Sequence, residues 1–439
     1  MSAFAERRTR VLDAIGDGMM IVPAAVHAVR NNDTEYEYRQ SSDFFYLTGF
    51  TEPEAVLVLA PHAKERVTLF LRERDRTKEI WNGKRLGVEA AGGALAVDAA
   101  YPIGEFAQRL PGLIAGARRA FVQLGTDPAF DRTFFAALEG ARNATRRAGF
   151  APDTFVEPGT ILHAMRAIKD AGEIETMRRA ASITRLGHLA GMRATRPGLT
   201  EFELEAIIEY TYRANGAQSL AYESIVAGGD NATILHYVAN RDPLRAGDLV
   251  LVDSAAELDS YASDITRTWP VSGRFSPEQR AIYEIVLAAQ HAAIAEVRPG
   301  AHVRSAHDAA VNVLVAGLID LGLLKGSSAE ALENETYKAF YMHGTGHWIG
   351  LDVHDVGAYR LADGETHRPL EPGMVVTVEP GLYVHRDLAC DERFKGIGVR
   401  IEDDVLCGPD GPVNLSPGIP KEIDEIESIV GTGELAAAR

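Results

Sequence analysis

Short apolar runs recur between residues 19 and 125, each about the length of a β-strand. They read MMIVPAA, FFYLTGF, AVLVLAP, RVTLFLRE and AFVQLG, and stretches with helical periodicity, such as EFAQRLPGLIAGARR, lie between them. Alternation of strand-length runs with helical stretches is typical of an α/β domain. We therefore predict an α/β domain in the N-terminal part of the chain.

The pattern of apolar and polar residues changes around Pro158. A long amphipathic helical pattern follows from Ala164 to Thr195, and it predicts the opening helix of a second domain. We place the boundary near residue 160, which gives an N-terminal domain of residues 1–160 and a C-terminal domain of residues 161–439. A chain of 439 residues exceeds what one hydrophobic core usually organises, so two domains agree with its length.

The C-terminal domain shows one order of elements twice. After the opening helix, Thr200 begins another with a capping-box spacing to Glu203, and the strand runs SLAYESIVAGG, DLVLVD and YASDITRTW follow. Ser276 and Pro277 then begin a helix to about residue 297, a further helix follows, and the strands GMVVTVEPGLY and GIGVRIEDDVL come next. Two helices followed by strands in each half predict two related half-domains that face each other.

Four acidic residues end or interrupt apolar strand-like runs in these halves. They are Asp253 in LVLVD, Asp264 in YASDITRTW, Glu379 in VVTVE and Glu402 in VRIEDD. A single carboxylate at a strand end is most often solvated. Four such placements instead predict a metal site, because buried carboxylates need a positive charge to compensate them.

The spacing in each half allows two carboxylates to meet. Asp253 and Asp264 are eleven residues apart, so a hairpin centred on residues 258–259 would set them directly opposite each other, with Cβ atoms about 5 Å apart. The same test places Glu379 opposite Glu402 across the loop-like stretch HRDLACDERFKG. Each predicted hairpin therefore contributes one pair of facing carboxylates.

Alternation of side chains along a strand places Arg400 on the same face as Glu402. Four carboxylates within a few Å would raise one another's pKa values unless cations hold them ionised, and two divalent ions cancel four negative charges. Oxygen-rich ligation with a single imidazole suits Mn²⁺, with Co²⁺, Zn²⁺ or Fe²⁺ as alternatives.

The segment HGTGHWIGLDVHDVG supplies candidate imidazoles. His343 and His347 have the spacing of helical zinc-protease histidines, but the two glycines between them disfavour a helix. One of the pair would then bind metal and the other substrate. His354 in this segment and His236 in ILHY are flanked by apolar residues, which predicts positions in pocket walls.

The composition excludes several classes of partner. With 62 acidic and 45 basic residues the formal net charge is −17, which repels nucleic-acid phosphates and anionic membrane surfaces. The two cysteines, Cys390 and Cys407, are too few for a disulfide framework. The sequence shows no signal-peptide core and no segment of membrane-spanning length. We expect a soluble cytoplasmic protein with no nucleic-acid or membrane partner.

The sequence resembles the Xaa-Pro aminopeptidases (aminopeptidase P), within the group that also holds prolidases, methionine aminopeptidases and creatinase. The matching segments run in family order, and they are ILHY, LVLVDSAAELDSYASDITRTWPV, HGTGHWIGLDVHDVG, VVTVEPGLY, GIGVRIEDD and, more weakly near the N-terminus, YRQSSDFFYLTGF. The resemblance covers nearly the whole chain. It implies a creatinase-type N-terminal α/β domain followed by a pita-bread catalytic domain.

The resemblance also implies roles for individual residues. Five residues match the ligands of a dinuclear metal site, with the second and the last as bridging ligands: Asp253, Asp264, His347, Glu379 and Glu402. Glu379 would also assist the metal-bridging water as general base. Three histidines would hold the substrate and stabilise the tetrahedral intermediate, and two further residues would lie near the prolyl side: His236, His343 and His354, then Arg400 and Tyr383.

The implied function is removal of the N-terminal residue from peptides with proline in second position, by a hydroxide that bridges two divalent metals, most simply Mn²⁺. A prolidase restricted to Xaa-Pro dipeptides is the nearest alternative, and a metal-free binding protein on the same fold is an alternative of another class. The intact ligand set disfavours both that binding protein and a creatinase-like hydrolase. The resemblance further suggests a homodimer or homotetramer.

Overall fold

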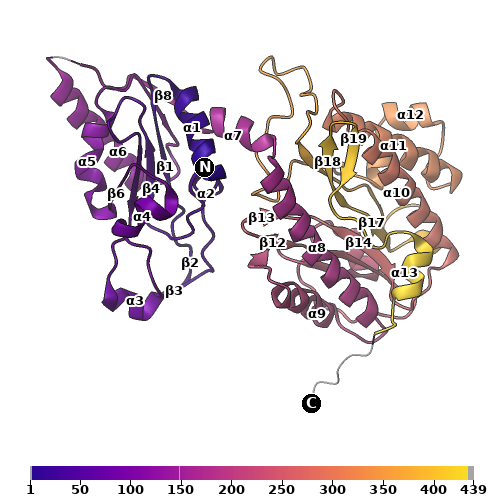
Figure 1. The fold of residues 1–439 in the computed structure, drawn as a ribbon. Helices are drawn as coiled ribbons and strands as arrows, with labels where there is room; N and C mark the ends of the chain where they lie inside the picture. Colours follow the sequence, from indigo (N-terminus) through magenta and orange to yellow (C-terminus); the bar gives the residue numbers. More distant parts are fainter. Residues whose placement is uncertain (1, 148, 434–439) are drawn as a thin grey trace. The chain divides into compact units, whose positions relative to one another are not determined.

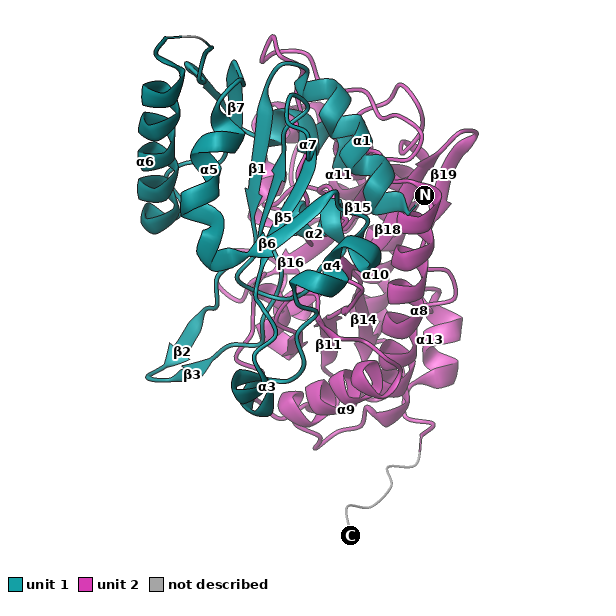
Figure 2. Ribbon diagram, turned by 60° about the vertical axis from the view of Figure 1, so that its left-hand side comes forward, with its two compact units in different colours: residues 1–166 teal, residues 167–439 magenta. Residues whose placement is uncertain are grey.

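The structure is a computed structural model that describes residues 2–147 and 149–433. It divides the chain into two compact units, Met1–Arg166 and Ala167–Arg439, which Figure 2 shows in different colours. The boundary expected near residue 160 falls inside helix α7 (Gly159–Ala167). The change in the pattern of apolar and polar residues near Pro158 therefore marks the start of this helix. The division between the units comes near the end of the helix.

A mixed six-stranded sheet forms the centre of the first unit. Its order is β6 (Ala99–Pro102), β5 (Val67–Leu71), β4 (Val56–Leu59), β1 (Met19–Pro23), β7 (Arg119–Val122) and β8 (Thr154–Val156). Helices α5 (Phe106–Ile114) and α6 (Pro128–Thr145) cover one face, and α1 (Ala3–Ile15) and α2 (Ser42–Thr48) cover the other (Figure 1). Strands β4 and β5 are buried along their whole length, as expected of central strands covered on both faces.

One apolar run of this unit is a helix, where the sequence pattern suggested a strand. The run FFYLTGF lies mostly in α2, which ends at Gly49 with φ of 64°. This left-handed conformation suits glycine and closes the last helical turn, because the Gly49 N–H donates to the carbonyl of Phe45. A short apolar run that is buried on all sides has no periodicity that distinguishes helix from strand.

The long helical pattern at the start of the second unit is two helices. Helix α7 ends at Ala167, and α8 (Ala171–Ala194) begins after Asp170. The Asp170 side chain accepts from the Glu173 N–H, and the Glu173 side chain accepts in return from the Asp170 N–H, which makes a capping box. The expected capping box at Thr200 is present and begins α9 (Glu201–Ala214).

The predicted repetition of elements is confirmed. In the first half, α8 and α9 precede β9 (Ser219–Leu220), β10 (Ile225–Gly228), β11 (Leu249–Asp253), β12 (Ala256–Leu258), β13 (Tyr261–Ala262) and β14 (Thr266–Pro270). In the second half, α10 (Pro277–Ala295) and α11 (Val303–Asp320) precede β15 (Val375–Val378), β16 (Gly381–Val384), β17 (Ile397–Arg400), β18 (Asp403–Gly408) and β19 (Gly411–Asn414). Figure 1 shows the strands β14 and β17 between the two helix pairs.

The long strand runs of the sequence are interrupted where they pass the centre of the unit. GMVVTVEPGLY splits into β15 and β16, and GIGVRIEDDVL splits into β17 and β18. Strand β15 pairs with β18, and β16 pairs with β17, so both runs break at the same level. Among the described residues, the longest helices are too polar to cross a lipid bilayer.

A buried ionic network ties the strands of the two halves together beneath these breaks. Arg267 on β14 donates to Asp403 Oδ1 at 2.6 Å and to the carbonyl of Glu402 at 2.6 Å. Lys421 donates to Asp403 Oδ2 at 2.8 Å. Burial alone would raise the pKa of Asp403, but the charges of Arg267 and Lys421 outweigh it and hold that pKa at about 2.

Replacement of Asp403 by asparagine should destabilise the second unit, because it leaves the guanidinium of Arg267 buried without its counter-charge. We expect a loss of about 3–5 kcal/mol in unfolding free energy, measured on metal-free protein by thermal unfolding. The exposed ion pair of Arg280 with Glu284 offers a matched control, and Glu284→Gln should leave the unfolding temperature nearly unchanged.

The stabilisation by Asp403 should also depend on pH. Its folded pKa of about 2 is below the ordinary value of 3.8, so the contribution is fully present above about pH 4 and is lost as the pH falls toward 2. The difference in stability between wild type and Asp403→Asn should therefore narrow below pH 4. A difference that stays constant between pH 5 and pH 3 would show that the carboxylate charge is not its source.

Candidate metal centre

The four predicted carboxylates all lie at the ends or breaks of strands. Asp253 is the last residue of β11, and Asp264 lies between β13 and β14. Glu379 lies between β15 and β16, and Glu402 lies between β17 and β18. At these positions the strand ladders open, so the side chains line one cavity of about 630 Å³ in the second unit. Its size is in the range of small-molecule and peptide sites.

The expected register of the first pair is wrong by two residues. Asp253 pairs with Thr266 and not with Asp264, and the ladder continues through Leu258 paired with Tyr261. The turn therefore centres on residues 259 and 260, whose φ angles of 48° and 65° match a two-residue hairpin turn with both central residues left-handed. Asp264 consequently precedes β14, where it reaches toward the second half of the unit.

The second pair has the predicted register. Val378 pairs with Asp403 on one side of the break, and Gly381 pairs with Arg400 on the other. Antiparallel pairing carried through the break sets Glu379 opposite Glu402, as the sequence spacing predicted.

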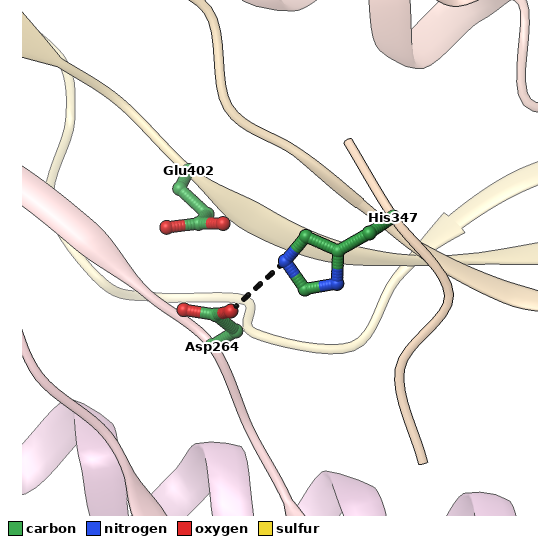
Figure 3. A group of neighbouring side chains, drawn as sticks. All are labelled: Asp264, His347 and Glu402. Atoms are coloured by element: carbon green, nitrogen blue, oxygen red, sulfur yellow. Dashed lines mark ion pairs between the residues drawn. The ribbon is translucent and has the colours of Figure 1, made fainter. Parts of the chain in front are cut away.

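Asp264, His347 and Glu402 form the tightest group of possible ligands. Each offers one ligand atom, and these three atoms lie within 4.8 Å of one another. Figure 3 shows the two carboxylates and the imidazole pointing toward a common space from three separate segments. His347 Nε2 lies 3.3 Å from Asp264 Oδ2 and 4.0 Å from Glu379 Oε1, so Glu379 borders the same space.

Backbone pairing fixes His347 next to Glu379. The segment of residues 345–348 runs alongside β15 and makes an isolated antiparallel bridge between Trp348 and Val376. The Thr377 N–H donates to the His347 carbonyl at 2.9 Å, and the Glu379 N–H donates to the Thr345 carbonyl at 2.8 Å. Gly346 is required for this approach, because a Cβ there would lie 1.9 Å from the Thr377 carbonyl oxygen. The predicted absence of a helix in this segment is confirmed.

The hydrogen bonding of His347 prepares its other nitrogen for a ligand. Nδ1 lies 3.0 Å from the carbonyl of Trp348, which only accepts, so Nδ1 carries the proton in the neutral ring. Burial alone would lower the pKa of His347, but the hydrogen bond to Asp264 and the charges of Asp264 and Glu379 outweigh it and raise that pKa to about 9. Without a bound cation Nε2 is therefore also protonated and faces Asp264 Oδ2 at 3.3 Å, and a cation would take the place of this proton. A backbone carbonyl on the far ring nitrogen is the usual support of a metal-binding histidine.

Burial raises the pKa values of Glu402 and Glu379 in the cavity. For Glu402 the pKa lies well above the ordinary value, first because of burial and then because of the charges of Asp264 and Glu379. Burial likewise raises the pKa of Glu379 to about 8, although His347 and Arg400 oppose the shift. Cations placed among these oxygens would supply the missing positive charge.

A hydrogen-bonded chain of four side chains lies along one wall. Arg400 Nη2 donates to Asp253 Oδ2 at 2.6 Å, and its Nη1 donates to the Tyr383 hydroxyl at 3.0 Å. His343 Nδ1 lies 2.6 Å from the carbonyl of Gly344 and so carries the ring proton, which leaves Nε2 to accept from the Tyr383 hydroxyl at 2.8 Å. Burial, followed by the charge of Arg400, lowers the pKa of His343 to about 3, so this ring is neutral at physiological pH.

The two remaining histidines line the mouth of the cavity. His236 and His354 are both exposed and both belong to its lining. The ring of His354 contacts that of His347 edge to face, with centroids 4.3 Å apart. The structure thus places nine of the ten residues predicted for the site in the lining of one cavity. The tenth, Tyr383, is buried and hydrogen-bonded to Arg400 and His343.

Family comparisons agree with this geometry. The model of "Metallopeptidase family M24" matches residues 175–409, and that of "Aminopeptidase P, N-terminal domain" matches residues 4–122. The chain belongs to metallopeptidase family M24. The predicted fold, an α/β domain followed by a pita-bread catalytic domain, is confirmed by the same matches.

Two similar M24 relatives carry the same activity in their names. The chain is 44% identical to the Xaa-Pro aminopeptidase of Haemophilus influenzae, over 97% of this chain and 96% of the relative, and 42% identical to that of Escherichia coli, over 97% of each. Among solved structures it matches aminopeptidase PepP of Pseudomonas aeruginosa with a TM-score of 0.94 and 48% identity, covering 97% of each chain. The chain is thus a metal-dependent peptidase of the aminopeptidase P type.

Two polar residues of this M24 site escaped the sequence analysis. The Tyr222 hydroxyl donates to Asp253 Oδ1 at 2.6 Å, and the Thr266 hydroxyl donates to Glu402 Oε2 at 2.7 Å. Each fixes the orientation of one carboxylate from a neighbouring strand or loop. The one available signal was the position of Thr266 two residues after Asp264, which puts both side chains on one face of an extended segment.

Replacement of Glu402 by alanine should reduce metal binding more than any change of a surface carboxylate. We expect wild type to retain about two equivalents of Mn²⁺ after dialysis and Glu402→Ala less than one, measured by elemental analysis. Asp410→Ala, in the turn before β19, is the control. Circular dichroism of both variants should match wild type; full metal retention by folded Glu402→Ala would remove Glu402 from the ligand set.

Proposed function

We propose that the protein releases the N-terminal residue from peptides whose second residue is proline, with two divalent cations held by Asp253, Asp264, His347, Glu379 and Glu402. The observation that carries the proposal is the complete set of four carboxylates and one imidazole around one cavity, in a chain that matches Xaa-Pro aminopeptidases over 97% of its length. Loss of this donor set would be expected of a binding protein on the same fold.

The donor set suits hard cations. Carboxylate oxygens outnumber the single imidazole nitrogen, which favours Mn²⁺ over metals that prefer sulfur or several imidazoles. When bound, the cations activate the attacking water and polarise the scissile carbonyl. Co²⁺ and Zn²⁺ also fit these donors. We propose Mn²⁺ because oxygen donors predominate among them.

The chain's own residues hold the substrate. An Xaa-Pro bond has no N–H, so recognition has to use the shape of the ring and the free amine of the first residue. The wall formed by Arg400, Tyr383 and His343 is rigid, because its hydrogen bonds connect it to Asp253. This wall would receive the proline, and the exposed imidazoles of His236 and His354 would contact the scissile carbonyl.

Glu379 is the residue placed to move a proton. Its carboxylate borders the space between Asp264 and Glu402, and its backbone is fixed by the Thr345 carbonyl. It would accept a proton from the attacking water at a carboxylate oxygen and pass it to the prolyl nitrogen as the bond breaks. The products are the free first residue and a peptide that begins with proline.

We propose that the protein acts in the cytoplasm as a homodimer or homotetramer, consistent with its acidic composition and with the family resemblance. Gel filtration with light scattering measures the assembly directly.

Proline in the second position should be required. A peptide Xaa-Pro-Yaa should be cleaved at least about 100-fold faster, in kcat/KM, than the matching Xaa-Ala-Yaa. Liquid chromatography of the products, with release of Xaa as the readout, measures both rates. Equal rates would leave a general aminopeptidase, whereas cleavage restricted to Xaa-Pro dipeptides would identify a prolidase.

Replacement of Glu379 by glutamine should lower kcat by about 10²–10⁴-fold, because the amide occupies the same space without accepting the proton. Chelation of wild type should abolish activity, and Mn²⁺ should restore it. Retention of activity after chelation would contradict the metal-dependent mechanism, and near-normal kcat in Glu379→Gln would assign the proton transfer to another group.

A further inference from the structure

A second cavity adjoins the metal cavity in the same unit. It measures about 370 Å³ and has basic and aromatic walls, formed among others by Arg304, His307, Lys338, Tyr341, Met342 and Tyr359. It shares His343, Gly344 and Gly346 with the metal cavity. The segment that carries His343 thus separates two cavities and lines both.

The charge of this second cavity is opposite to that of the whole chain. Arg304, at the start of α11, and Lys338, in the 3₁₀ helix Thr336–Ala339, both line it, and within its described lining there is no acidic residue. Their ion-pair partners, Asp308 and Glu335, are exposed and lie outside that lining. In a chain of net charge −17, a cavity with only cationic ionised groups is a specific feature.

His307 is one of three histidines in the lining of the cavity. Burial, followed by the charge of Arg304, lowers the pKa of His307; the charge of Asp308 opposes the shift and that of Lys338 adds to it. His307 is therefore a neutral hydrogen-bonding group in the wall. Its Nδ1 lies 2.9 Å from the Thr345 hydroxyl, which also bonds the Tyr341 hydroxyl at 2.6 Å.

These hydrogen bonds hold the shared segment in place. Thr345 is fixed on its side chain by His307 and Tyr341, and on its carbonyl by the Glu379 N–H. Gly344 is exposed, and a Cβ there would have no neighbour within 4 Å. The dividing segment is thus fixed at Thr345 and exposed at Gly344.

We propose that the second cavity binds the residues that follow proline and that Arg304 and Lys338 recognise the C-terminal carboxylate of short peptides. This inference rests on the proposed function, because His343 places the second cavity next to the prolyl-side wall. A peptide with an amine at one end and a carboxylate at the other then matches an acidic cavity followed by a basic one. Tyr341, Met342 and Tyr359 offer apolar contact to the intervening side chains.

The test compares peptides Xaa-Pro-(Yaa)n of one to four residues beyond proline, each as free acid and as C-terminal amide. Wild type should prefer the acid in kcat/KM by about three- to tenfold at one or more lengths, mainly through KM. Each added residue extends the chain by at most about 3.6 Å, so the preferred length reports the distance from proline to the basic groups. The preference should weaken at high salt.

The double variant Arg304→Gln/Lys338→Gln should reduce the ratio of kcat/KM for the free acid to kcat/KM for the amide to about one. It should leave hydrolysis of the Xaa-Pro dipeptide unchanged. Both side chains are about half exposed, so the variant should fold normally. Lys325→Gln, an exposed lysine outside both cavities, is the matched control and should keep the wild-type ratio.

Three results would overturn the inference: a ratio near one at every length in wild type, an unchanged ratio in the double variant, or an equal fall in the control. These outcomes are separate from the proposed function. If Xaa-Ala peptides are cleaved as fast as Xaa-Pro peptides, the proline assignment fails, whereas the comparison of acid with amide still reports on the second cavity.

Discussion

The organisation of the second unit depends on the burial of carboxylates close to one another. Asp253, Asp264, Glu379 and Glu402 lie in one cavity, and burial raises the pKa values of three of them. Such a cluster is costly unless positive charge compensates it. Arg400, which is hydrogen-bonded to Asp253, supplies part of that positive charge. The negative charge that is left without compensation is the reason that this donor set fits divalent cations.

Hydrogen bonds from the neighbouring segments hold the carboxylates of this cluster in place. The breaks in the two strand ladders free the acidic side chains from the sheet, while the ion-paired network of Asp403, Arg267 and Lys421 holds the strands beneath them. Tyr222 and Thr266 orient individual carboxylates, and the segment of residues 345–348 is paired along β15. The site is therefore preorganised by its surroundings before any ligand binds.

Local sequence signals predicted the helix caps at Thr200 and Ser276, the repeated order of elements and the register that opposes Glu379 to Glu402. The first hairpin was misplaced because residues 259 and 260 adopt left-handed conformations without the usual Asn-Gly signal. The pairing of residues 345–348 with β15, and the contacts of Tyr222 and of His307, join segments far apart in the chain. Contacts of that kind follow from tertiary packing, which a single sequence does not encode by spacing.

The tightest group of donors takes one member, Asp264, from the first half of the unit and two, His347 and Glu402, from the second. A cation held by all three would connect the two halves, in addition to the continuous chain and to contacts such as the ion pair of Arg267 with Asp403. By thermodynamic linkage, each factor of ten in free cation above the dissociation constant adds about 1.4 kcal/mol to the native state. Metal binding at these three residues would thereby stabilise the fold as well as supply the chemistry.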